Sequence, residues 1–76
     1  MKYQEYIKSL EAKELAQCVN ELKILHKTAI LPPNGKVRKI MDMIDKELET
    51  HTYSLQMAEN AILEEAADRF VVIVGG

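Results

Sequence analysis

Two adjacent prolines, Pro32 and Pro33, divide a chain that is otherwise patterned for helices. Proline has no amide hydrogen, and the residue before a proline is pushed out of the helical region, so no regular helix continues through this pair. Asn34 follows directly, and asparagine is a residue type that caps helix N-termini. We therefore expect a corner over residues 28–34 that joins two helices.

The segment before the corner has apolar residues three to five positions apart, with most of its charged residues on the other side. This pattern predicts an amphipathic helix over residues 3–27. Ser9 allows a second interpretation, in which it caps the main helix and residues 1–8 form a short separate turn. We favour a single helix with an irregularity at Ser9.

The segment after the corner carries a seam of apolar residues at alternating spacings of four and three, typical of packed helices. Its positions are Val37, Met41, Ile44, Leu48, His51, Leu55, Ala58 and Ile62. His51 interrupts the seam within a stretch of weak helix formers. Either the chain bends there, giving helices over 35–50 and 52–70, or one helix of ~52 Å runs past its partner. Both alternatives predict an all-α fold, and the bend completes a small three-helix bundle.

The last residues, 71–76, read Val-Val-Ile-Val-Gly-Gly and carry no charge. β-Branched residues favour extended backbone, so we expect a short extended tail or strand. Such an apolar segment promotes aggregation when it is exposed. We expect the helices or a second copy to cover it.

A domain of 76 residues buries only ~60% of the surface of its unfolded chain, so its stability needs a supplement. Cys18 is the only cysteine, which excludes an internal disulfide. Self-association remains, and we expect a homodimer. The residues expected to pack between the two copies are Leu55, Ile62, Leu63 and Phe70.

The sequence offers little that resembles a catalytic or metal centre. Cys18 and His26 lie on one face of the first predicted helix, but they are ~12 Å apart along its axis, which is too far for a hydrogen bond. His26 and His51 would have at most Cys18 as a third metal ligand. We therefore expect no enzymatic activity, no metal and no cofactor.

No apolar run approaches the ~20 residues of a membrane-spanning helix. The N-terminal residues lead into an amphipathic pattern rather than the apolar core of a signal peptide. We expect a cytoplasmic protein with no contact to a membrane.

Charge is distributed unevenly along the chain. Residues 22–41 contain five cations and no acid, whereas residues 42–68 contain eight acids and one base. Lys36, Arg38 and Lys39 lie in the first turn of a predicted helix, where the positive end of the helix dipole disfavours cations. Acids gather near the opposite end of the chain, where the dipole disfavours them in turn.

Three explanations fit this layout. The free amides of the helix N-terminus, with Lys36, Arg38, Lys39 and, across the corner, Lys27, could bind a phosphate or an acidic protein surface. Alternatively, the basic end of one subunit could meet the acidic end of another. The third explanation is a solvated charged face without a partner.

These patterns favour a non-enzymatic helical module for protein–protein interaction. We expect a regulator or inhibitor that binds a partner protein and self-associates. The alternative is a nucleic-acid-associated regulator that uses the basic corner. It is less favoured because the helix after the corner becomes acidic within two turns and would repel a phosphate backbone.

Overall fold

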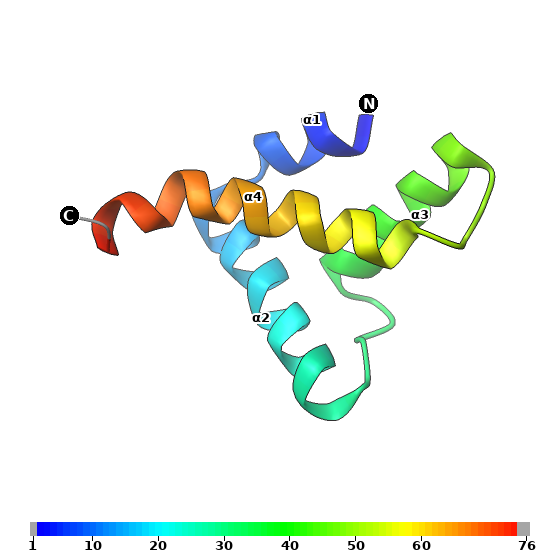
Figure 1. The fold of residues 1–76 in the computed structure, drawn as a ribbon, viewed down its shortest axis with the longest axis horizontal. Coiled ribbons are helices and arrows are strands. Elements are labelled where there is room, and N and C mark those ends of the chain that lie inside the picture. The colour runs from blue at the N-terminus through cyan, green and yellow to red at the C-terminus, as the bar shows by residue number, and fades with distance from the viewer. Residues whose placement is uncertain (1, 75–76) are drawn as a thin grey trace.

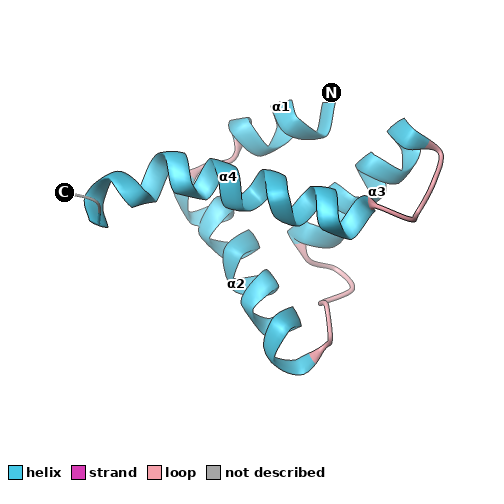
Figure 2. Ribbon diagram, viewed as in Figure 1, coloured by secondary structure: helices cyan, strands magenta, loops and turns pink. Residues whose placement is uncertain are grey.

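A computed structural model describes residues 2–74 of the chain, and within this range it contains four helices joined by short loops (Figures 1 and 2). They are α1 (Lys2–Ser9), α2 (Ala12–Thr28), α3 (Lys36–Leu48) and α4 (Ser54–Val74). The described residues form no strand. The all-helical prediction is confirmed for this part of the chain.

The longest helix, α4, organises the packing because it contacts each of the other three (Figure 1). The molecule is flattened, with dimensions of 41 × 29 × 18 Å. All four helices contribute to one core, and a fully buried Leu or Ile contributes ~1.5–3 kcal/mol to stability. The buried apolar residues are Tyr3, Ile7, Leu10, Leu15, Cys18, Leu22, Val37, Ile40, Ile44, Ala58 and Ile62.

The predicted single helix over 3–27 is wrong, because the helix is interrupted between α1 and α2. The Ser9 hydroxyl donates to the Tyr6 carbonyl, which ends α1 at the residue where an irregularity was expected. Glu11, rather than Ser9, is the N-cap of α2. It forms a reciprocal capping box with Glu14, whose carboxylate accepts the Glu11 amide at 3.0 Å. The break turns Leu10 into the core.

The proline corner is longer than a tight hairpin. Ala29 ends α2 in the left-handed conformation, with φ of 60°, and its amide donates to the Leu25 carbonyl at 2.7 Å. The loop then returns along α2, so that α3 begins beside Glu21, in the body of that helix. The N-cap of α3 is Gly35, not the expected Asn34.

The connection between α3 and α4 settles the alternatives raised by His51. The chain bends there, and a continuous helix is wrong. Glu49 ends α3 in the left-handed conformation, with φ of 57°, and His51 Nδ1 lies 2.8 Å from Asp45 Oδ2. Ser54 is the first residue of α4, and its hydroxyl donates to the His51 carbonyl.

Helix α4 continues through Val74, so the predicted extended tail is wrong over 71–74. The remaining part of that prediction, residues 75–76, lies outside the described residues. None of the helices in the described range combines the length and apolar character that a membrane crossing requires.

Candidate functional site

The basic residues at the start of α3 surround a carboxylate that belongs to the chain itself. Glu21 of α2 is 5% exposed, and its oxygens accept the backbone amides of Lys36 at 3.2 Å and Val37 at 3.1 Å. Gln17 donates to the same carboxylate from one turn earlier. The positive end of the α3 dipole is therefore occupied by an internal anion. The amides of Lys36 and Val37 are thus not free for an external phosphate, and anion binding by the cations around them stays a prediction.

Gly35 is the residue that lets this carboxylate approach. A Cβ atom at position 35 would lie 2.3 Å from Glu21 Oε1 and 2.8 Å from Oε2, far inside van der Waals contact. The backbone of Gly35 has φ of −84° and ψ of 173°, which any residue adopts, so glycine provides space here rather than backbone freedom, and a larger residue would displace the Glu21 carboxylate. The absence of a side chain at Gly35 thus allows the Glu21 carboxylate to reach the amides at the start of α3.

Two of the three cations at the start of α3 also have partners within the chain. Lys36 Nζ lies 3.2 Å from Glu14 Oε2. The pKa of Glu14 is lowered, first by its hydrogen bond with the Glu11 backbone and then by Lys36. Lys39 Nζ lies 5.2 Å from the centroid of the Tyr6 ring, within cation–π range. Carboxylates from α2 and a ring from α1 thus offset cations that the helix dipole disfavours.

Arg38 is exposed, and its side chain makes no hydrogen bond, ion pair or cation–π contact with the described residues. It borders a hollow of ≈ 290 Å³. The other residues of the hollow are Pro33, Asn34, Gly35, Lys36, Lys39 and Asp42. Lys27, expected to lie beside them, is six residues beyond Glu21, which is ~9 Å further along the α2 axis. The structure brings Lys36, Arg38 and Lys39 together and leaves Lys27 apart.

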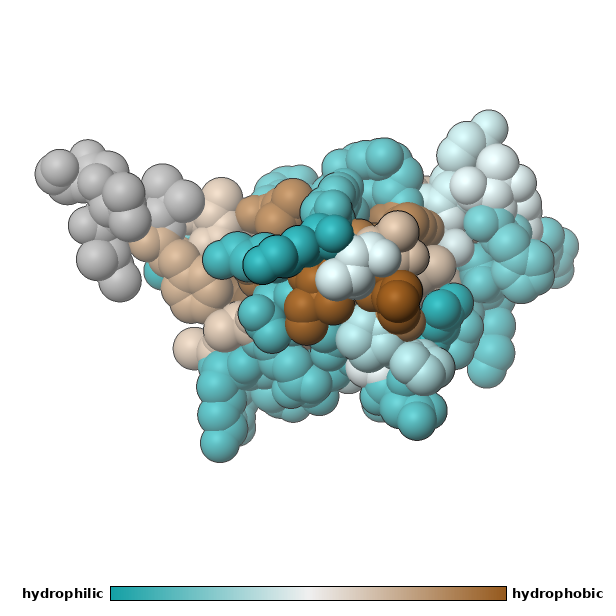
Figure 3. Space-filling model, turned by 90° about the horizontal axis from the view of Figure 1, so that it is seen from below, coloured by the Kyte–Doolittle hydropathy of each residue, from teal (hydrophilic) through white to brown (hydrophobic). Residues whose placement is uncertain are grey.

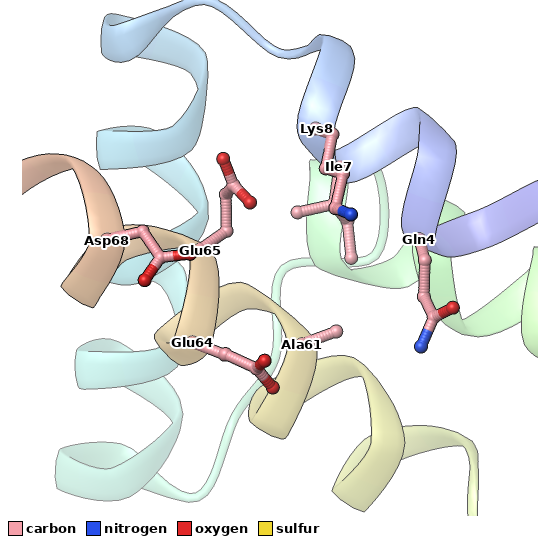
Figure 4. Close-up of a pocket in the computed structure, with 7 residues that line it drawn as sticks. All are labelled: Gln4, Ile7, Lys8, Ala61, Glu64, Glu65 and Asp68. Atoms are coloured by element: carbon pink, nitrogen blue, oxygen red, sulfur yellow. The ribbon is translucent and has the colours of Figure 1, made fainter.

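The sequence suggested that the acidic residues of α4 lie at its C-terminal end, but they do not. Asp68 is followed by six more helical residues, so Glu64, Glu65 and Asp68 occupy the middle of α4. Together with Gln4 and Lys8 of α1 they border a hollow of ≈ 180 Å³ between the two helices (Figure 4).

Arg69, beside this hollow, caps a helix C-terminus, whereas Glu21 caps a helix N-terminus. Its Nε donates to Glu65 at 2.7 Å, and its terminal nitrogens donate to the carbonyls of Ile7, Lys8 and Leu10. These carbonyls lie at the end of α1, where a cation is favourable for the dipole. Arg69 therefore ties Glu65 to the end of α1.

The four residues expected at a dimer interface do not share one environment. Ile62 is fully buried in the core of a single chain and has no surface free for a second copy. Leu63 is 46% exposed, Leu55 is 38% exposed, and Phe70 is half-buried. Only the exposed members of the set can contact another molecule.

Leu63 and Phe70 line an apolar groove of ≈ 490 Å³ between α2 and α4. The full lining is Ala16, Val19, Asn20 and Lys23 from α2 and Leu63, Ala66, Ala67 and Phe70 from α4. We call this the α2–α4 groove. Seen from below, the molecule shows brown and tan surface among teal (Figure 3).

Cys18 and the two histidines are separated. Cys18 is fully buried, and burial, followed by the nearby Glu21 charge, raises the pKa of its thiol to about 11. His26 is exposed and contacts Glu59, whereas His51 contacts Asp45 in the α3–α4 connection. Among the described residues no group of three His, Cys, Asp or Glu side chains has the geometry to hold a metal ion.

Comparison of the chain with models of protein families, with curated proteins and with solved structures finds no match.

Sequence reasoning missed the charged residues that cap helices from a distance. Glu21 lies three residues after Cys18 and four before Leu25, so it is in phase with the buried face of α2. Arg69 lies seven residues after Ile62 and is in phase with the buried face of α4. A charged residue on an apolar stripe is costly unless it is paired. Its position in the stripe therefore indicates a buried partner elsewhere in the chain.

Proposed function

We propose that this protein is a non-enzymatic helical interaction module that acts as a regulator or inhibitor by binding another protein molecule and by self-association. The observation that carries the proposal is the α2–α4 groove. The groove is lined mostly by apolar side chains from two helices, and Leu63 among them is 46% exposed. Contiguous apolar surface of this kind is typical of a protein-binding face.

The non-enzymatic part of the proposal is supported by the positions of the reactive residue types. The Cys18 thiol is fully buried and its pKa is raised, so it is a poor nucleophile. His26 points to Glu59, far along α2 from that thiol, and cannot act as its base.

The test compares the full-length chain with two charged variants as affinity baits in an extract of its native host that also contains the untagged chain. Leu63→Glu places a charge in the groove, and Tyr53→Glu is the matched control because Tyr53 is 61% exposed and does not line the groove. We expect the wild-type and Tyr53→Glu baits to retain a protein, another copy included, that Leu63→Glu loses. Identical proteins on all three baits would contradict the proposal.

The nucleic-acid alternative is tested separately with Arg38, an exposed cation at the start of α3 that makes no ion pair with the described residues. The assay is a mobility-shift titration with DNA and RNA across salt concentrations. If the protein is a protein-binding module, we expect it to bind neither nucleic acid even at low salt. A steeply salt-dependent shift that Arg38→Glu abolishes would favour the alternative, because phosphate contacts release counterions.

A further inference from the structure

Asn34 is followed directly by Gly35, and the pair lies in the loop that leads into α3. The carbonyl carbon of an asparagine side chain is within reach of the backbone nitrogen of the next residue, and attack by that nitrogen closes a succinimide ring. A side chain on the next residue hinders this attack, whereas glycine leaves the nitrogen accessible. Asn34 is therefore the most reactive asparagine of the chain, because the others, Asn20 and Asn60, precede larger residues.

The local structure of the loop leaves this pair free to react. Asn34 is exposed, and its side chain makes no hydrogen bond with residues 2–74. The Gly35 nitrogen donates one bond, to the Pro32 carbonyl at 3.3 Å, which is longer than the usual ~2.9–3.0 Å. In contrast, Asn20 and Asn60 lie inside α2 and α4, where the next amide donates to the carbonyl four residues earlier. Ring closure thus meets the least resistance in the loop.

Cations surround the site of this reaction. Asn34 and Gly35 border the hollow at the start of α3 together with one acid, Asp42, and three cations, Lys36, Arg38 and Lys39. Ring closure begins when the Gly35 nitrogen loses its proton, and negative charge then passes to the side-chain oxygen of Asn34. Cations stabilise nearby negative charge, and here they outnumber the single carboxylate. The electrostatics of the hollow therefore favour the reaction.

We propose that Asn34 is a site of spontaneous deamidation. The deprotonated Gly35 nitrogen bonds to Cγ of Asn34, the Cγ–N bond of the side-chain amide breaks, and the amide nitrogen takes up a proton and leaves as ammonia. Water then adds to a carbonyl carbon of the succinimide and breaks its bond to the ring nitrogen. Breakage at Cγ gives aspartate with the original backbone, whereas breakage at the backbone carbonyl gives isoaspartate, which has one more methylene in the backbone. Nothing is oxidised or reduced, and water is the only co-reactant.

Both products change the start of α3, and this inference does not rest on the proposed function. Three cations and Asp42 give the hollow a formal charge of +2, and a carboxylate at residue 34 lowers it to +1. Isoaspartate also lengthens the backbone immediately before Gly35, the N-cap of α3. The first amides of α3 then shift relative to the Glu21 carboxylate, to which they donate at 3.2 and 3.1 Å. Isoaspartate, but not aspartate, therefore weakens the attachment of α3 to α2.

The test is peptide mapping by mass spectrometry of the purified full chain, incubated in the folded state at several pH values. We expect the peptide that contains Asn34 to lose ammonia and gain water, and the peptides that contain Asn20 and Asn60 to stay unchanged. The initial rate rises about tenfold per pH unit, because only the deprotonated nitrogen attacks. In the Glu21→Ala background, where a Cβ at residue 35 meets no carboxylate, Gly35→Ala removes most of the conversion, because the new methyl group hinders the nitrogen.

A sample unfolded in guanidinium chloride at the same pH measures the reaction without the loop structure. Conversion there but none in the folded chain overturns the inference, because the turn would then protect Asn34. Equal conversion of Asn20 or Asn60 in the folded chain overturns it as well. The isoaspartate form, separated by chromatography, is compared with Asn34→Asp, which carries the same new charge on the original backbone. A lower urea midpoint for the isoaspartate form alone supports the weakened start of α3, and equal midpoints contradict it.

Discussion

Removal of the Glu21 carboxylate by Glu21→Ala leaves the amides of Lys36 and Val37 without their acceptor at a buried helix end. An unsatisfied buried donor costs ~1–3 kcal/mol, so the two together reduce the free energy of unfolding by ~2–6 kcal/mol. Small domains have total stabilities near the lower end of ~5–15 kcal/mol, so this is a large fraction of the whole.

Gly35→Ala attacks the same contact from the other side. The new methyl group would lie 2.3 Å from Glu21 Oε1, so the carboxylate must leave its place between the two amides. We expect a loss of ~2–4 kcal/mol in unfolding free energy, since the same donors lose their acceptor. In the Glu21→Ala background the obstacle is absent and the backbone at residue 35 suits alanine, so Gly35→Ala then costs only the ~0.5–1 kcal/mol by which alanine is the poorer N-cap residue.

The assay is urea unfolding followed by circular dichroism at 222 nm for the wild type, both single variants and the double variant. A constant concentration of trimethylamine N-oxide in all samples maintains a folded baseline. Unfolding free energies are compared only between variants whose free energy falls with urea at the same slope. A changed slope indicates that the unfolded or the native state has changed. Equal costs of Gly35→Ala in both backgrounds would refute the reasoning, because the two residues would then act independently.

Three further outcomes follow from the charged and buried groups. Arg69→Ala lowers the unfolding free energy by ~1–2 kcal/mol and accelerates amide exchange selectively in α1, because the carbonyls at the end of that helix lose their donor. Acid titration of unfolding shows a loss of stability as pH falls below ~4. His51 lowers the pKa of Asp45, and the hydrogen bond from the Glu11 backbone lowers the pKa of Glu14. A carboxylate with a lowered pKa stabilises the fold above its unfolded pKa, and this stability is lost as the pH falls through the folded pKa. The loss of stability on acidification is therefore shallower in Asp45→Asn and in Glu14→Gln. Cys18, whose pKa is about 11, reacts with a disulfide reagent at pH 8 at least ~10²-fold more slowly than a small free thiol until urea unfolds the chain.

The predictable part of the fold was the part encoded by local pattern. Pro32 and Pro33 lie in the loop between α2 and α3, and the weak helix formers around His51 lie in the bend between α3 and α4, because both residue types disfavour a helix locally. The all-helical class followed from the spacing of apolar residues.

Two elements that sequence reasoning missed lie near the ends of the chain. The break before α2 rests on a capping box made by Glu11 and Glu14, a pattern that lacks the usual Ser or Thr at the cap. The β-branched residues 71–74 are helical because they continue α4, where helix propagation overrides the intrinsic preference of a short segment. Local propensity therefore failed at both ends of the chain.

The candidate site shows the same division. Lys36, Arg38 and Lys39 were found from their unfavourable position in the helix dipole, and the structure brings them together. Their compensation by Glu21 and Glu14 spans fifteen or more residues of sequence and depends on how the corner folds back along α2. A charge count along the chain contains no such information.

Concentration-dependent ¹H–¹⁵N spectra test the central claim most directly, because they locate an interaction face as well as detect one. On dilution of the purified chain from about 500 to 20 micromolar, we expect amide shifts to move at Val19, Lys23, Leu63 and Ala67, which line the α2–α4 groove. Arg38, outside the groove, serves as the reference whose shift stays constant. Spectra that are independent of concentration, or changes confined to the surface around Arg38, would contradict the claim.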